Sequence, residues 1–187
     1  MAKFFGNLHA VLVAGLLLSF AVIFALNPQE ANANGFLRWL HTFVGIVWIG
    51  LLYYFNFVQI PTMPSVPAEL KPGVTKYIAP KALFFFRWAA ALTVLFGLGI
   101  AGGAKYLAPA LMLQDPYTLI GVGMWLGLIM AFNVWFVIWP AQQKALGLVE
   151  ADADTKAAAA TRAMIFSRIN TLLSLPMLYT MVSFNGG

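Results

Sequence analysis

Residues 36–60 read FLRWLHTFVGIVWIGLLYYFNFVQI, a stretch of 25 residues in which Arg38 is the only charge. A transmembrane helix needs about 20 mostly apolar residues. The stretch is also too long and too continuous for the alternating pattern of a membrane barrel strand. It therefore predicts a membrane-spanning helix, and this prediction decides the fold class.

Further stretches of the same character lie on both sides of it, at roughly residues 8–26, 82–103, 117–139 and 163–184. Each is bounded by helix-ending residues: Asn27-Pro28, Pro61, Pro80-Lys81, Asp115-Pro116, Pro140 and Asn185-Gly186-Gly187. The sequence predicts an all-α integral membrane bundle of about five transmembrane helices, forming a single transmembrane domain over residues 1–187. Residues 8–26 also fit a signal peptide, with Ala31-Asn32-Ala33 as a cleavage site, but we expect them to remain as a span.

The composition agrees with this class, since 61% of the residues are hydrophobic and 9% are charged, with a mean hydropathy of +0.83. A soluble domain carries about a quarter charged residues. This excludes an ordinary soluble enzyme, a disordered tail and a nucleic-acid-binding domain, although the pI is about 9.6. We expect the lipid bilayer as a partner and no nucleic acid. The absence of cysteine excludes disulfides, thiolate metal sites and covalent haem attachment.

The basic residues of the loops predict the orientation, because cytoplasmic loops carry an excess of Lys and Arg. One side holds Lys3, Lys71, Lys76, Lys81, Lys144, Lys156 and Arg162, whereas the other holds Lys105 and Arg38. The sequence predicts a multi-pass protein of the bacterial inner (cytoplasmic) membrane, with a cytoplasmic N-terminus and a periplasmic C-terminus.

Two connecting segments have distinct compositions. Residues 61–80 are proline-rich and predict an extended or turning loop. Residues 150–162 are alanine-rich, with acidic residues first and basic residues last, which suits a helix dipole and predicts an extension of the last span. In addition, small residues at Gly97-x-x-x-Ala101, Gly99-x-x-x-Gly103 and Gly123-x-x-x-Gly127 predict that spans three and four pack closely together.

Polar residues inside apolar spans are the best indicators of function, because they are costly in lipid. Near the cytoplasmic ends of the spans lie Asn7, His9, Tyr53, Tyr54, Asn56, Gln59, Arg87, Asn133, Ser167, Arg168 and Asn170. Arg87 and Arg168 have no acidic partner within any span and offer planar donors to a planar anion or phosphate. We take Arg87, Asn133, Arg168 and Asn170 as candidate substrate-binding residues. The alternatives are that the arginines reach to the headgroups and that the asparagines join helices.

Near the exterior ends lie Arg38, Trp39, His41 and Thr42, with Met177 and Met181. A neutral imidazole at His41 is a candidate metal ligand for haem iron, and Met177 or Met181 is a candidate second ligand of the same cofactor. The alternative role for His41 is a hydrogen bond between helices. His9 is expected roughly 20 Å away, at the opposite ends of antiparallel helices, and zinc, copper or di-iron sites lack suitable ligands.

Three stretches resemble the membrane domain of the cytochrome c-linked urate oxidase, also called urate hydroxylase. They are residues 38–57 (RWLHTFVGIVWIGLLYYFNF), 133–142 (NVWFVIWPAQ) and 167–178 (SRINTLLSLPML). The resemblance implies oxidation of urate, with electrons passed to a cytochrome c domain. The 187 residues contain no such domain, having no cysteine, and fewer spans than expected of full-length urate-oxidising members. The resemblance marks His41, Asn133, Arg168 and Asn170 as family positions without assigning roles to them, and the catalytic residues stay unknown.

Three functional hypotheses follow. The first is a membrane redox protein, a urate oxidase-like oxidoreductase that binds haem b and passes electrons to an external c-type cytochrome. The second is a non-catalytic accessory or assembly subunit of a larger membrane complex, and self-association into a homo-oligomer also stays open. The third is an anion transporter, which five spans without repeat symmetry fit poorly.

Overall fold

The computed structural model describes residues 1–184, which contain helices and no strands. The end signal Asn185-Gly186-Gly187 lies outside the described residues. The long helices are α2 (Leu8–Leu26), α3 (Ala33–Tyr53), α6 (Ala79–Gly103), α8 (Thr118–Phe132) and α10 (Ala153–Ser183). Short ones are α1 (Ala2–Phe5), α4 (Ile60–Thr62), α5 (Lys71–Gly73), α7 (Leu107–Leu111) and α9 (Trp139–Ala145). The predicted all-α bundle is confirmed.

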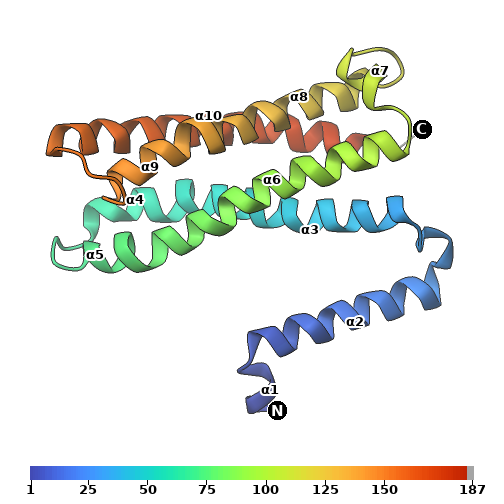
Figure 1. The fold of residues 1–187 in the computed structure, drawn as a ribbon, viewed down its shortest axis with the longest axis horizontal. Coiled ribbons are helices and arrows are strands. Elements are labelled where there is room, and N and C mark those ends of the chain that lie inside the picture. Colours follow the sequence, from blue (N-terminus) through green and yellow to red (C-terminus); the bar gives the residue numbers. More distant parts are fainter. Residues whose placement is uncertain (185–187) are drawn as a thin grey trace.

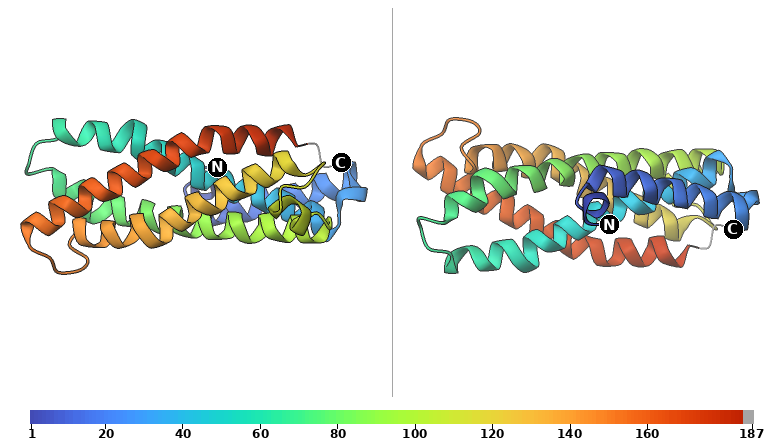
Figure 2. Two further views of the ribbon diagram at one scale, coloured as in Figure 1. Left: turned by 90° about the horizontal axis from the view of Figure 1, so that it is seen from above. Right: turned by 90° about the horizontal axis from the view of Figure 1, so that it is seen from below.

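The bundle consists of four antiparallel rods: α3 with α4, α5 with α6, α8 with α9, and α10 (Figures 1 and 2). The α3 rod packs chiefly on α6, whereas α8 and α9 pack chiefly on α10. The centre of the bundle is filled by apolar side chains that are almost completely buried: Trp48, Leu52, Phe86, Met130 and Val134. The α3–α6 hairpin and the α8–α10 hairpin thus share one hydrophobic core.

Helix α2 stands beside this bundle rather than within it (Figure 1). It contains no buried residue and is apolar on every side. Its contacts with α3 are aromatic, with the Phe20 ring 5.7 Å from the Phe36 ring and 6.1 Å from the Trp39 ring. A helix that is hydrophobic all round and has no protein cover is suited to a lipid environment.

Four helical segments are long and apolar enough to span a membrane: Leu8–Leu26, Ala33–Ser65, Lys71–Gly103 and Thr118–Ala145. They mark the chain as a membrane protein and confirm four of the predicted spans. The segments Ala33–Ser65 and Lys71–Gly103 have 33 residues each, about 50 Å at 1.5 Å per residue. A bilayer core is about 30 Å thick, so these rods are longer than a span requires.

The predicted fifth span, residues 163–184, falls in α10, which is not one of these four segments because it carries more polar and charged residues. Its buried face consists of the small or polar residues Ala159, Ala163, Ser167, Asn170, Ser174 and Thr180, together with Met177. Large apolar side chains such as Leu172, Leu175 and Val182 are instead more than 60% exposed. Small interior residues and apolar lipid-facing residues are typical of packed transmembrane helices.

The predicted helix ends at Pro61, Pro80 and Pro140 are wrong, because each helix continues through its proline. Each proline follows a π-helical turn by two residues: η2 (Tyr54–Gln59), η4 (Val74–Ile78) and η5 (Asn133–Ile138). Just before each proline, a backbone N–H bonds five residues back, from Ile60 to Phe55, from Ala79 to Val74 and from Trp139 to Val134. In an α-helix the proline ring collides with the carbonyl four residues earlier, and the wider turn accommodates it.

The predicted extended loop over residues 61–80 is wrong for the same reason. Helical turns continue to Ser65 and resume at Lys71, which leaves a short connection between them. The predicted helical extension at residues 150–162 is confirmed from Ala153 onward. The side chain of Asp152 caps its first turn by accepting from the Thr155 backbone N–H at 2.7 Å.

The small residues also pack differently from the prediction that they join spans three and four. On α6, Gly97 faces His41, Gly99 faces Leu37 and Gly103 faces Asn34, all residues of α3. On α8, Gly123 faces Thr180 and Met181 of α10. These glycines therefore lie at the α6–α3 contact and at the α8–α10 contact, because Gly lets two helix backbones approach most closely.

Candidate functional site

Six polar side chains from three rods form a layer across the bundle. They are Tyr53, Asn56, Asn133, Ser167, Asn170 and Ser174, which we call the buried polar layer. Asn170 and Ser174 are fully buried, and Ser167 and Asn133 nearly so. Buried polar groups are stable only when hydrogen-bonded, so their partners decide what the layer can do.

The centre of the layer is a pair of asparagines. Asn133 Nδ2 donates to Asn170 Oδ1 at 2.9 Å, and Asn170 Nδ2 donates to the Met130 carbonyl at 2.9 Å. Asn133 begins the π-helical turn η5, and its backbone N–H is shared between the Ile129 and Met130 carbonyls. At the start of this π-helical turn, the Met130 carbonyl is therefore positioned to accept from the Asn170 side chain.

The outer part of the layer is less completely paired. Asn56 Nδ2 donates to Ser167 Oγ at 2.8 Å, and Tyr53 Oη lies 3.0 Å from Ser174 Oγ. The Oδ1 atom of Asn56 and the Oε1 atom of Gln59 are buried without a hydrogen-bond donor. Two amide oxygens on η2 can therefore accept bonds from a molecule with N–H or O–H groups.

The two arginines expected beside the asparagines lie elsewhere. Arg168 is exposed on the outer side of α10. Arg87 is half-buried, with its guanidinium carbon 3.4 Å from the centroid of the Trp139 ring. In the described residues neither arginine is hydrogen-bonded to Asn133 or Asn170. The structure brings the asparagines together and separates both arginines from them.

His41 lies on α3, at the opposite end of the bundle from Pro61, Pro80 and Pro140. Its Nδ1 atom is 2.8 Å from the Thr93 carbonyl oxygen of α6, and a carbonyl can only accept, so Nδ1 carries the proton. The ring packs on Gly97, where a Cβ atom would come within 3.0 Å of His41 Cε1. This tautomer leaves Nε2 with a free lone pair, as in histidines that bind metals.

The candidate methionines lie on α10 and pack in or against the core that the four rods share. Met177 is buried in the main core, and the Cε atom of Met181 faces Gly123 of α8. His41 contacts α6 instead. His41 therefore fits an axial ligand by its tautomer, whereas its observed contacts do not pair it with either methionine.

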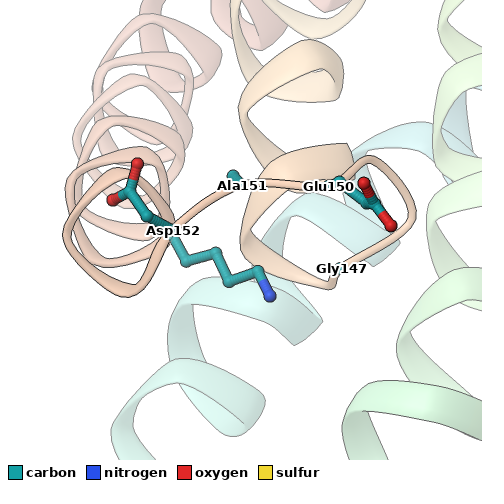
Figure 3. Close-up of a pocket in the computed structure, with 5 residues that line it drawn as sticks. Gly147, Glu150, Ala151 and Asp152 are labelled. Carbon is teal, nitrogen blue, oxygen red and sulfur yellow. The ribbon is translucent and has the colours of Figure 1, made fainter.

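Two hollows are present away from His41. One is a shallow pocket at the loop between α9 and α10, lined by Gly147, Glu150, Ala151, Asp152 and Lys156. Figure 3 shows the Glu150 and Asp152 carboxylates on opposite sides of this loop, and Asp152 is occupied in capping α10. The other is an apolar groove between α6 and α8. Among residues 1–184, no group of three or more His, Asp or Glu side chains is placed to hold a metal ion.

Sequence reasoning missed Ser174 and the stacking of Arg87 on Trp139. Ser167, Asn170, Ser174 and Met177 are spaced by three, four and three residues, which is the period of one helix face. That spacing could have identified the buried face of α10. The stacking involves Trp139, which directly follows a π-helical turn, whereas the sequence predicts a helix end at Pro140.

A family model described as urate oxidase N-terminal matches residues 112–185. The matched stretch contains α8, η5, α9 and α10, and with them Asn133, Arg168 and Asn170. No curated protein matches the chain, and no solved structure matches it. The resemblance to urate oxidase is thus confirmed over residues 112–185, the segment that contains α8, α9 and α10.

Proposed function

We propose that this membrane bundle, similar over residues 112–185 to the N-terminal region of urate oxidase, is a redox protein that holds a haem b at His41. In this proposal the haem exchanges single electrons with a separate c-type cytochrome at the exterior face. The observation that supports it is the hydrogen bond from His41 Nδ1 to the Thr93 carbonyl.

The hydrogen bond matters because it fixes both the tautomer and the orientation of the imidazole. Metal-binding histidines generally donate their second ring N–H to a carbonyl or carboxylate. His41 is eight residues into α3 from Ala33, about 12 Å from that end of the helix. A haem at this depth would lie near the exterior surface, where a soluble cytochrome can approach it.

The observed contacts support His41 alone as an axial ligand in this proposal. Met177 and Met181 stay candidates for the second position. In that arrangement His41 of α3 and one methionine of α10 would contact the same haem. Thioether ligation raises the potential of haem iron. Met177→Leu and Met181→Leu should therefore lower the reduction potential only if the corresponding methionine is a ligand.

For the substrate we propose a planar anion of the urate class, received at the buried polar layer. Urate presents ring N–H groups and carbonyl oxygens, which complement amide oxygens and amide N–H groups. Asn56 Oδ1 and Gln59 Oε1 are buried acceptors without donors, and the Asn133–Asn170 pair lies within the matched family stretch. These two unpaired oxygens support a ligand that donates hydrogen bonds to them.

Absorption spectroscopy of protein purified in mild detergent tests the haem proposal. We expect a Soret band, a sharpened visible band on dithionite reduction, and loss of both in His41→Ala. His9→Gln on the exposed helix α2 is the matched control and should retain the spectrum. Wild-type protein without a Soret band and without stoichiometric iron would overturn the proposal.

Urate binding is tested separately, by calorimetric titration of the same preparation with urate. We expect Asn170→Ala to abolish the binding isotherm, while Asn27→Ala, at the loop end of α2, leaves it unchanged. If wild-type protein shows a Soret band but no heat of urate binding, the redox part stands and the substrate assignment fails.

The proposal also retains the predicted orientation, with the proline-rich end of the bundle in the cytoplasm and the His41 end in the periplasm. Support comes from the connections 66–70 and 146–152, which lie at one end of the bundle, beside Lys71, Lys76 and Lys144. Alkaline phosphatase fused after Lys105 should be active, and fused after Gly147 inactive. The reverse result would invert the orientation.

The structure also favours a second candidate, an accessory subunit of a larger complex. Helix α2 contains no buried residue and touches the bundle only near its loop end, so its surface is free to pack against another membrane protein. Native gel electrophoresis after gentle solubilisation should then show a heteromeric band. A band containing this chain alone would remove this candidate.

A further inference from the structure

The groove between α6 and α8 faces outward from the bundle. It is lined by Ala91, Val94 and Leu98 on one side and by Leu128, Phe132 and Trp135 on the other, and it holds about 450 Å³. All of these side chains are apolar apart from the indole N–H of Trp135, which is occupied by the Arg87 carbonyl at 3.1 Å. The groove therefore has the chemistry of a site for a hydrocarbon chain.

A cationic group lies at one end of this groove. Arg87 precedes Ala91 by one helical turn and so occupies the same face of α6. Its guanidinium carbon is 3.4 Å from the Trp139 ring centroid and 5.9 Å from that of Trp135, a groove residue. The indole rings fix the position of the charge relative to the hydrocarbon groove.

Within residues 1–184, the guanidinium of Arg87 forms no ion pair. Its Nε and Nη1 atoms are buried without a hydrogen-bond acceptor. Among residues 1–184 the ion pair that forms joins Arg38 to Glu30, at the other end of the bundle. Buried N–H groups of a cation are costly when unpaired, so the half-buried Arg87 favours an anion at its Nε and Nη1 atoms, and a guanidinium suits a phosphate well.

The depth of Arg87 matches a phospholipid headgroup. Arg87 lies 16 residues from Gly103, the exterior end of α6, which is about 24 Å along the helix. A bilayer core of about 30 Å then places Arg87 just inside the boundary of the opposite leaflet. Trp135 and Trp139 lie at the level where aromatic residues collect in membrane proteins.

We propose that this groove binds one anionic phospholipid of the leaflet at the proline-rich end, with its phosphate on Arg87 and an acyl chain between α6 and α8. A soluble anion would leave the apolar groove empty, and a zwitterionic lipid would bring its own cation toward Arg87. A second copy of this chain offers no acidic residue within its spans to meet the guanidinium.

The test uses full-length protein in vesicles and the quenching of tryptophan fluorescence by brominated acyl chains. The probes are brominated phosphatidylglycerol and brominated phosphatidylcholine, each mixed into vesicles of unbrominated phosphatidylcholine. We expect the wild type to prefer the anionic probe by about tenfold, the size expected for a hydrogen bond to a charged group, and Arg87→Gln to abolish the preference. Arg168→Gln removes an exposed charge from α10 and is the matched control, which should retain it.

A second variant leaves the charge intact. Ala91→Phe fills the groove beside Arg87, and we expect it to lose the preference as well. Equal losses in Arg87→Gln and Arg168→Gln would show general surface attraction and overturn the proposal. Equal quenching by both lipids would do the same. A dimer that excludes both probes would identify the groove as a contact between copies and would also overturn it.

Discussion

The guanidinium carbon of Arg87 lies 3.4 Å from the centroid of the Trp139 ring, and this contact joins α6 to α9. The same two rods are joined a turn away by the hydrogen bond from Trp135 Nε1 to the Arg87 carbonyl. Both tryptophans belong to the segment around the π-helical turn η5. Both of these contacts between the two helix hairpins are therefore made beside the π turn.

The first prediction is a measurable coupling between Arg87 and Trp139. A cation–π contact contributes about 0.5–2 kcal/mol, more when it is desolvated. A double-mutant cycle with Arg87→Gln, Trp139→Leu and the double variant should give a coupling of about 1 kcal/mol in reversible unfolding by SDS. The same cycle with Arg168→Gln in place of Arg87→Gln should be additive. Additivity in both cycles would contradict the stacking.

Most of the fold was predictable because apolar runs longer than a bilayer core leave few alternatives to a helical bundle. The predicted spans 8–26, 36–60, 82–103 and 117–139 each correspond to one of the four apolar helical segments of the structure. The errors occurred at prolines. Pro61, Pro80 and Pro140 ended the predicted spans, but a π turn lets the helix continue where proline collides with an α-helical carbonyl.

The candidate site was predictable in its residue types but not in its grouping. Asn133 and Asn170 were expected to share a layer and are hydrogen-bonded. Arg168 was grouped with them from depth alone, yet it is exposed. Distance along a span gives depth, whereas the face of the helix depends on packing, and for α10 the outward face is the apolar one. In soluble proteins the apolar face of a helix is normally buried, whereas α10 buries its small and polar side chains and exposes large apolar ones.

The second prediction concerns the space behind His41. Gly97→Ala places a Cβ atom 3.0 Å from His41 Cε1, so the imidazole has to shift by a few tenths of an ångström. We expect weaker haem retention and a displaced Soret band, without loss of the helical circular dichroism. Gly102→Ala on the same helix is the control, because a Cβ atom there meets nothing within 4 Å. Identical spectra for both variants would contradict a role of Gly97 in positioning the ring.

The third prediction concerns the asparagine pair. Asn170→Ala leaves the Asn133 side-chain amide without its acceptor and removes one of the two hydrogen bonds to the Met130 carbonyl. Each unsatisfied buried group costs about 1–3 kcal/mol, so unfolding in detergent should occur at a clearly lower temperature. Arg168→Ala, two residues away on the exposed side, should change the midpoint little. Equal midpoints for the two variants would show that the pair does not stabilise the bundle.

The last prediction is a pH dependence at the start of α10. The Asp152 carboxylate accepts from the backbone N–H of Thr155 at 2.7 Å and from its hydroxyl at 2.8 Å, and these bonds hold the pKa of Asp152 below its ordinary value. Because the pKa is lower in the folded protein, the capping stabilisation is present above the unfolded pKa and is lost as the pH falls through the folded one. Amide hydrogen exchange in the first turn of α10 should therefore accelerate selectively in acid, after correction for intrinsic rates. Asp152→Ala should show fast exchange at every pH, while Glu150→Gln in the preceding loop should keep the wild-type profile. An acid transition that survives in Asp152→Ala would assign the effect to another group.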